Sequence, residues 1–85
     1  MKYEVRWTPS SMRDMKRLDP SVARRILDGV RRLANEQYGD VRKLAGYDDE
    51  YRLRIGDWRV RFTVDTQAKT LIVLRVLHRS DAYKS

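Results

Sequence analysis

Four arginines alternate with large apolar side chains in the stretch EYRLRIGDWRVRF, residues 50–62. They are Arg52, Arg54, Arg59 and Arg61. A guanidinium group carries a fixed positive charge and five N–H donors in a planar fork, which suits bidentate contacts to phosphate. Several such groups on a rigid surface can bind a phosphodiester and stabilise the negative charge that develops during its cleavage. From these residues alone, we predict a surface that binds a strongly negative ligand.

The same stretch predicts a β-hairpin with a two-residue turn at Gly56 and Asp57, because a glycine-first pair fits a type II′ turn. All four guanidinium groups then fall on one face and the apolar side chains on the other. The opposed pairs would be Ile55 with Trp58, Arg54 with Arg59, Leu53 with Val60, and Arg52 with Arg61. Like charges directly opposite destabilise a sheet by up to about 1 kcal/mol per pair. We therefore favour a phosphate-binding surface over the alternative, in which the arginines merely extend into solvent.

The N-terminal half of the chain predicts the elements that must position this hairpin. Residues 2–7 alternate apolar and charged side chains, which indicates a half-buried strand. Thr8 as N-cap and Pro9 as first helical residue predict a short helix. A longer helix with one apolar stripe follows from Pro20 and is expected to end at Gly39.

The C-terminal half predicts strands. Residues 40–49 have the composition of an irregular connection, whereas 51–55, 58–64 and 70–78 have strand patterns. The last strand is apolar on both faces, as expected at the centre of a sheet. We therefore predict an α+β fold with one small domain, residues 1–85, in the order strand–helix–helix–strand–strand–strand. Its twisted, mainly antiparallel sheet would carry the two helices on one face.

Composition narrows the choice of partner. The net charge of +7 favours a polyanion such as nucleic acid or an acidic protein. Cysteine is absent and histidine occurs once, so we expect no metal and no small-molecule cofactor. No apolar run approaches the roughly 18 residues of a membrane span, and no signal-peptide core is present. We therefore expect no membrane partner and a cytoplasmic location.

The C-terminal stretch VLHRSDAYKS could add proton-transfer chemistry. It contains the single histidine, His78, followed by Arg79 and, five residues after the histidine, Tyr83. An imidazole can carry a proton near neutral pH, and a tyrosine ring can stack on a base or donate its hydroxyl. A histidine at a strand end and a tyrosine near a terminus can also serve only in packing, so both interpretations stay open.

Taken together, YRLRIGDWRVRF, the buried strand after it and the tail HRSDAY resemble the RelE/ParE toxin superfamily over essentially the whole chain. The resemblance implies a RelE-like fold and a toxin of a type II toxin–antitoxin module, neutralised by a cognate RelB-type antitoxin. RelE-type members are metal-independent endoribonucleases that enter the ribosomal A site and cut the bound messenger RNA. The 2′-hydroxyl of the RNA attacks the neighbouring phosphate, so the ribosome and messenger RNA are implied partners.

The resemblance also implies which residues act. The candidate catalytic residues are Arg52, Arg54, Arg59, His78, Arg79 and Tyr83. Arg59 and Arg79 would stabilise the transition state, while Arg52 and Arg54 would hold the scissile phosphate. Tyr83 would stack on a base or assist proton transfer.

Two features fall outside the family pattern. Arg61 is included as an RNA-binding residue only on the hairpin argument. The best-known members have lysines where this chain has Arg52 and Arg54. Arginine is effectively never deprotonated, so His78 or Tyr83 would have to accept the proton, or catalysis would rest on electrostatics.

Two other functions remain open at this point. The first is a ParE-type inhibitor of DNA gyrase on the same fold, although that branch generally lacks the HRSDAY tail. The second is a non-catalytic protein that binds RNA and leaves it intact.

Overall fold

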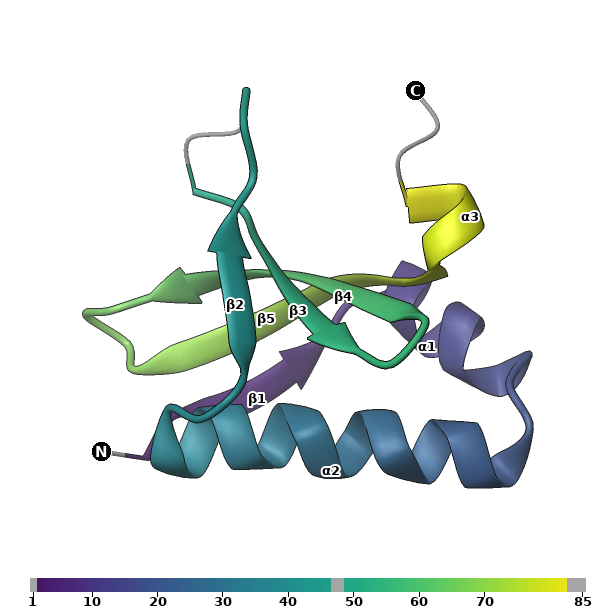
Figure 1. Cartoon of the computed structure of the whole chain (residues 1–85). Coiled ribbons are helices and arrows are strands. Elements are labelled where there is room, and N and C mark those ends of the chain that lie inside the picture. Colours follow the sequence, from purple (N-terminus) through teal and green to yellow (C-terminus); the bar gives the residue numbers. More distant parts are fainter. Residues whose placement is uncertain (1, 47–48, 83–85) are drawn as a thin grey trace.

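The computed structural model describes residues 2–46 and 49–82, which form a five-stranded mixed sheet with three helices (Figure 1). The elements in chain order are β1 Glu4–Trp7, α1 Pro9–Lys16, α2 Pro20–Glu36, β2 Asp40–Lys43, β3 Tyr51–Ile55, β4 Trp58–Asp65, β5 Thr70–His78 and α3 Arg79–Ala82. The strand order is β1-β5-β4-β3-β2, with β1 parallel to β5 and the other pairs antiparallel. The predicted α+β class is confirmed. None of the described helices is long and apolar enough to cross a membrane.

Three details differ from the sequence-based expectation. The segment 40–49 was expected to be irregular but contains β2, all four residues of which are exposed. This strand forms because backbone pairing along the free edge of β3 does not need an apolar side-chain pattern. The short helix α3 was not expected. Helix α2 ends at Glu36, before Gly39, because Gln37 adopts the left-handed conformation (φ 55°) and donates its N–H to the carbonyl of Leu33.

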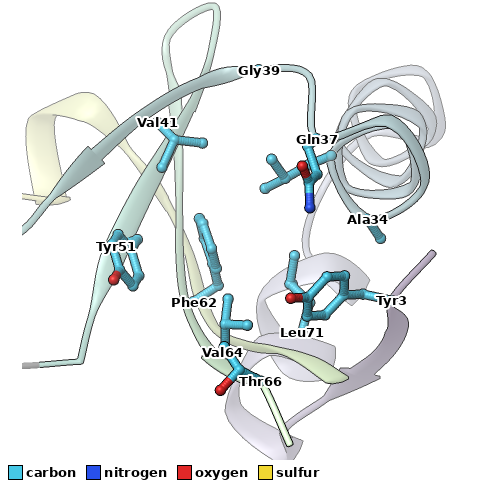
Figure 2. A pocket seen from close by; sticks show the side chains of 11 residues that line it. Tyr3, Ala34, Gln37, Gly39, Val41, Tyr51, Phe62, Val64, Thr66 and Leu71 are labelled. Carbon is cyan, nitrogen blue, oxygen red and sulfur yellow. The ribbon is translucent and has the colours of Figure 1, made fainter. Parts of the chain in front are cut away.

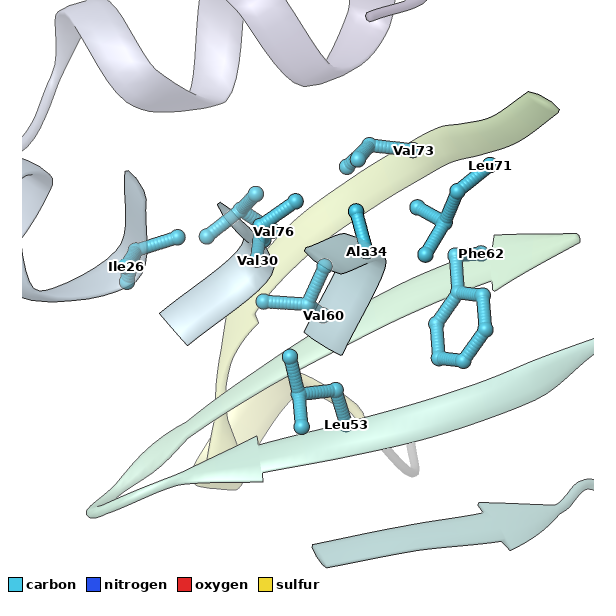
Figure 3. Close-up of a cluster of buried hydrophobic side chains, with 9 residues drawn as sticks. All are labelled: Ile26, Val30, Ala34, Leu53, Val60, Phe62, Leu71, Val73 and Val76. Atoms are coloured by element: carbon cyan, nitrogen blue, oxygen red, sulfur yellow. The ribbon is translucent and has the colours of Figure 1, made fainter. Parts of the chain in front are cut away.

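The hydrophobic core lies between α2 and one face of the sheet (Figure 3). Its members, each at most 4% exposed, are Ile26, Val30, Ala34, Leu53, Val60, Phe62, Leu71, Val73 and Val76. On β3 and β4 these apolar residues alternate with the arginines. Burial of the apolar face under α2 therefore holds the arginines on the opposite face.

A register shift between β4 and β5 lets more of β5 contribute to this core. Val60 pairs with Val76, but after the shift between Arg61 and Phe62, Phe62 pairs with Val73. Residues three apart on a regular strand point to opposite faces. The irregularity therefore brings both Val73 and Val76 to the α2 side of the sheet.

Helix α1 covers the part of the β5 edge that extends past the end of β1. The predicted N-cap Thr8 is confirmed, and its Oγ1 also donates to the carbonyl of Leu74 at 3.0 Å. Asp14 accepts the N–H of Val76 at 2.8 Å and two hydrogen bonds from Arg75 at 2.9 and 3.2 Å. The hydrogen bonding of the Arg75 guanidinium to the Asp14 carboxylate raises the pKa of Arg75 above its ordinary value. These contacts satisfy backbone groups at an edge that would otherwise be open.

Candidate phosphate-binding site

The β3–β4 hairpin has the predicted register, which places four arginines on one face. Arg54 lies opposite Arg59, and Arg52 lies opposite Arg61. Gly56 has a φ of 58°, the left-handed conformation that the predicted turn requires at its first position. Because directly opposed residues share a face, all four side chains leave the sheet on the side away from α2. We call this side the arginine face.

Strand β2 extends the arginine face in a way that the sequence had not indicated. Its Arg42 lies opposite Arg52, and its Asp40 lies opposite Arg54. A row of arginines thus crosses four neighbouring strands: Arg42, Arg52, Arg61 and Arg75. Sequence reasoning missed Arg42 and Asp40 because their strand has a single apolar residue, Val41, and therefore almost no hydrophobic pattern.

A polar cavity of about 340 Å³, here called the arginine cavity, opens on this face. Its lining residues are Asp40, Arg42, Lys43, Leu44, Arg52, Arg54 and Arg59. The volume is at the small end of the range of ligand pockets, about 300–1,000 Å³. Five of the seven lining side chains are cationic, so the expected ligand is an anion.

Two guanidinium groups of the cavity are largely buried. Arg52 is 8% exposed and Arg59 is 6% exposed, and neither forms an ion pair with any described residue. Nη1 of Arg59 donates to the carbonyls of Gly56 at 3.0 Å and Trp58 at 3.1 Å, which holds the group near the hairpin turn. Its buried Nε has no hydrogen-bond partner among the described residues. Burial of a charge without a counter-charge is costly, so these groups favour a bound anion.

The other two arginines of the hairpin differ in their position relative to the cavity. Arg54 is exposed and lines the cavity. Arg61 does not line it and forms an ion pair with Glu50. The structure therefore brings three of the four predicted arginines to the cavity, and the fourth is held beside it by a carboxylate.

His78 lies on the other side of the sheet. It is opposite Trp58, and the two rings form an edge-to-face contact with centroids 5.2 Å apart. Trp58 packs against the core, whereas its neighbour Arg59 points to the arginine face. Nδ1 of His78 accepts the N–H of Ser80 at 3.2 Å in α3. The histidine thus packs on Trp58 and fixes the start of α3, and it does not line the arginine cavity.

The remaining tail residues have different positions relative to the site. Arg79 contacts the hairpin turn twice. Its backbone N–H donates to the backbone carbonyl of Asp57 at 2.7 Å, and its side-chain Nε lies 3.9 Å from an Asp57 carboxylate oxygen. Its side chain is mostly exposed. Arg79 and Arg59 are therefore both attached to the same turn, through Asp57 and Gly56 respectively. Tyr83 lies outside the described residues.

A second cavity, of about 370 Å³, lies on the α2 side near the C-terminal end of that helix (Figure 2). Apolar and aromatic side chains dominate its lining, including Tyr3, Tyr51, Phe62 and Leu71. None of the described residues that line it is charged. An anion would therefore bind in the arginine cavity rather than in this apolar one.

Comparison with known proteins identifies the family. A family model described as the ParE toxin of the type II toxin–antitoxin system parDE matches residues 5–83. The chain belongs to the RelE/ParE toxin superfamily. The toxin RelG of Mycobacterium tuberculosis is 33% identical to this superfamily member over 96 residues, with 99% of each chain covered.

Solved structures of RelE/ParE toxins in complex share the fold described above. A chain of the RelBE2 toxin–antitoxin complex of M. tuberculosis matches with a TM-score of 0.84 and 26% identity, over 95% of both chains. A chain of the archaeal RelE–RelB complex of Pyrococcus horikoshii matches with a TM-score of 0.78 and 31% identity, over 96% of this chain and all of that one. The superfamily and the fold implied by the sequence resemblance are thus confirmed.

Proposed function

We propose that this toxin is a ribosome-dependent endoribonuclease that cuts messenger RNA at the arginine cavity. One observation carries the proposal: Arg52 and Arg59 are more than nine-tenths buried in the cavity lining and have no acidic partner among the described residues. Such groups need little reorganisation to meet a phosphodiester. RelG, a relative covered along its length, is also named as a toxin.

In the proposed reaction the chain binds one phosphate and stabilises its transition state. Arg52 and Arg54 hold the non-bridging oxygens of the scissile phosphate. The 2′-oxygen of the preceding nucleotide attacks phosphorus, and negative charge accumulates on the phosphorane-like transition state. Arg59, fixed by the turn carbonyls, stabilises that charge, and Arg79, which lies beside the same turn but outside the described cavity lining, adds positive charge nearby. Removal of one such donor typically lowers the rate about 10²- to 10³-fold. The products are a 2′,3′-cyclic phosphate and a 5′-hydroxyl.

The size of the site supports a role for the ribosome. The described cavity is small and polar, and it offers few groups that could orient a flexible RNA strand on both sides of the phosphate. Orientation of the reacting atoms can contribute several kcal/mol to a rate, about 7–11 in the best cases. We propose that the ribosomal A site supplies this orientation, which requires a cytoplasmic location.

We propose that a cognate antitoxin neutralises the toxin. The structural relative in M. tuberculosis was solved in a toxin–antitoxin complex, and the one in P. horikoshii was solved in a RelE–RelB complex. The net charge of +7 and the arginine face favour an acidic partner segment. A partly disordered RelB-type segment that folds over the arginine face would block access of RNA to the cavity.

The test is cleavage in a translating extract, with message ends mapped by primer extension. The wild-type chain should produce breaks in phase with the reading frame, and block of initiation should abolish them. Arg54→Ala removes an exposed guanidinium from the cavity and should lower the cleavage rate by at least about tenfold. This expected loss is smaller than the roughly 10²- to 10³-fold typical of one transition-state donor, because Arg54 is exposed. Arg24→Ala removes an exposed arginine of α2 and is the matched control, with cleavage unchanged. The absence of phased breaks, or equal breaks with Arg54→Ala, would refute the proposal.

A ParE-type inhibitor of DNA gyrase is the second candidate, because the matching family model is the one described for ParE. The same purified protein distinguishes the two functions in a gyrase supercoiling assay. Trapped, cleaved DNA together with an intact message would support the second candidate and exclude the first. Tight RNA binding with an intact message and no effect on gyrase would indicate a non-catalytic RNA-binding protein.

A further inference from the structure

The arginine cavity raises the question of which group accepts the proton of the attacking 2′-hydroxyl. Arginine is effectively never deprotonated in proteins, so four of the seven lining side chains cannot act as a base. His78, the titratable group expected from the sequence, lies on the opposite side of the sheet against Trp58. The described cavity must therefore obtain a proton acceptor elsewhere in its lining.

Asp40 is the one carboxylate in that lining. It is the first residue of β2 and lies directly opposite Arg54, which in turn lies opposite Arg59. Asp40, Arg54 and Arg59 thus form a row across three strands, with the carboxylate at one end and two guanidinium groups of the cavity beside it. Glu50, also near this face, does not line the cavity and is bound by Arg61.

The carboxylate of Asp40 also has no side-chain partner among the described residues. Although five cationic side chains line the same cavity, Asp40 forms no ion pair or side-chain hydrogen bond with any described residue. The other acidic side chains that meet an arginine of this face behave differently: Glu50 binds Arg61, and Asp14 binds Arg75. These two carboxylates hold arginines in place, whereas Asp40 keeps its lone pairs available for a ligand.

We propose that Asp40 is the general base of the cleavage reaction, an inference that rests on the function proposed above. The bond from the 2′-oxygen to phosphorus forms while the bond from phosphorus to the 5′-oxygen breaks. The proton of the 2′-hydroxyl passes to the carboxylate of Asp40. The departing 5′-oxygen takes a proton from water, and the hydroxide that remains removes the proton from Asp40. Arg52, Arg54 and Arg59 carry no proton in this scheme and act only through their charge.

Single-turnover cleavage on programmed ribosomes tests this role across a range of pH. Asp40→Asn keeps the shape of the side chain and should lower the cleavage rate by about 10²- to 10⁴-fold, the usual contribution of a general base. The acid limb of the pH–rate profile should disappear, while affinity for RNA stays equal or becomes tighter, since a negative charge beside arginines is removed. Asp40→Glu should restore part of the rate. Asp28→Asn, an exposed carboxylate of α2, is the matched control.

The outcomes separate this role from the proposed function itself. If the wild type cuts and Asp40→Asn cuts at the same rate with the same pH profile, Asp40 is not the base. If Asp40→Asn loses RNA affinity and keeps the acid limb, Asp40 positions the cavity and does not accept the proton. If the wild type leaves the message intact, the proposed function fails and the base role fails with it.

Discussion

Replacement of Arg59 by methionine is expected to lower message cleavage about 10²- to 10³-fold and to leave the stability of the fold within about 2 kcal/mol of the wild type. The side chain is 6% exposed, and its Nε has no hydrogen-bond partner among the described residues. Substitution of buried charged residues by apolar residues of similar volume is often neutral or stabilising by about 1–4 kcal/mol. Loss of the bonds to the Gly56 and Trp58 carbonyls opposes this gain by about 1 kcal/mol each. The expected net change in the free energy of unfolding therefore lies between about −2 and +2 kcal/mol.

The effect on cleavage should be much larger than the effect on stability. Without the fixed guanidinium, cleavage should fall about 10²- to 10³-fold. Urea denaturation and the single-turnover cleavage rate measure the two effects on the same preparation. Arg24→Met removes an exposed charge from α2 and should alter neither quantity. A strongly destabilised Arg59→Met protein would show that the arginine serves the fold, and near wild-type cleavage would show that it does not serve the reaction.

Replacement of Asp14 by alanine should produce the largest loss of stability among the polar substitutions considered. Its carboxylate is 10% exposed and accepts three hydrogen bonds, two from Arg75 and one from the backbone N–H of Val76. Loss of one partner from a largely buried, charged network typically costs about 2–4 kcal/mol. For a domain of this size, such a loss lowers the Tm by about 10–25 °C.

Thermal unfolding followed by circular dichroism checks this expectation. Asp28→Ala removes an exposed carboxylate of α2 that forms no ion pair with a described residue, and its effect should stay within about 0.5 kcal/mol. Equal melting curves for Asp14→Ala and Asp28→Ala would mean that the contact between α1 and the edge of β5 contributes nothing to stability.

Local sequence patterns were sufficient for the hairpin. Within residues 51–62, the alternating pattern and Gly56 together specify the turn, the strand register and the face on which each side chain lies. The structure contains every residue pair that we predicted for this hairpin. The extent of β5, Thr70–His78, was also predicted, because its apolar run ends at polar residues on both sides. In both cases the information lies in neighbouring residues, where sequence periodicity is most reliable.

Features that depend on distant pairing could not be predicted. Strand β2 is exposed at all four positions and forms because β3 offers a free edge, so its sequence has no apolar period. The cavity residues Asp40 and Arg42 therefore had no predicted position. The face of the sheet on which His78 lies could not be predicted for another reason. Strand β5 has apolar residues on both faces, so its sequence does not indicate which face is buried. In addition, the register shift opposite Arg61 and Phe62 changes which β5 residues face α2. Which face His78 takes therefore depends on the register with β4.

The role of the arginine cavity is tested most directly with a ribosome-bound message that lacks one 2′-hydroxyl. A purified ribosome complex carries either an all-ribose message or one with a single 2′-deoxynucleotide on the 5′ side of the cleaved bond. We predict that the wild-type toxin cuts the ribose message to a 2′,3′-cyclic phosphate and a 5′-hydroxyl, and leaves the substituted bond intact. Cleavage of the substituted bond, or products with a 3′-hydroxyl and a 5′-phosphate, would contradict attack by the 2′-oxygen on a phosphate held by the arginines.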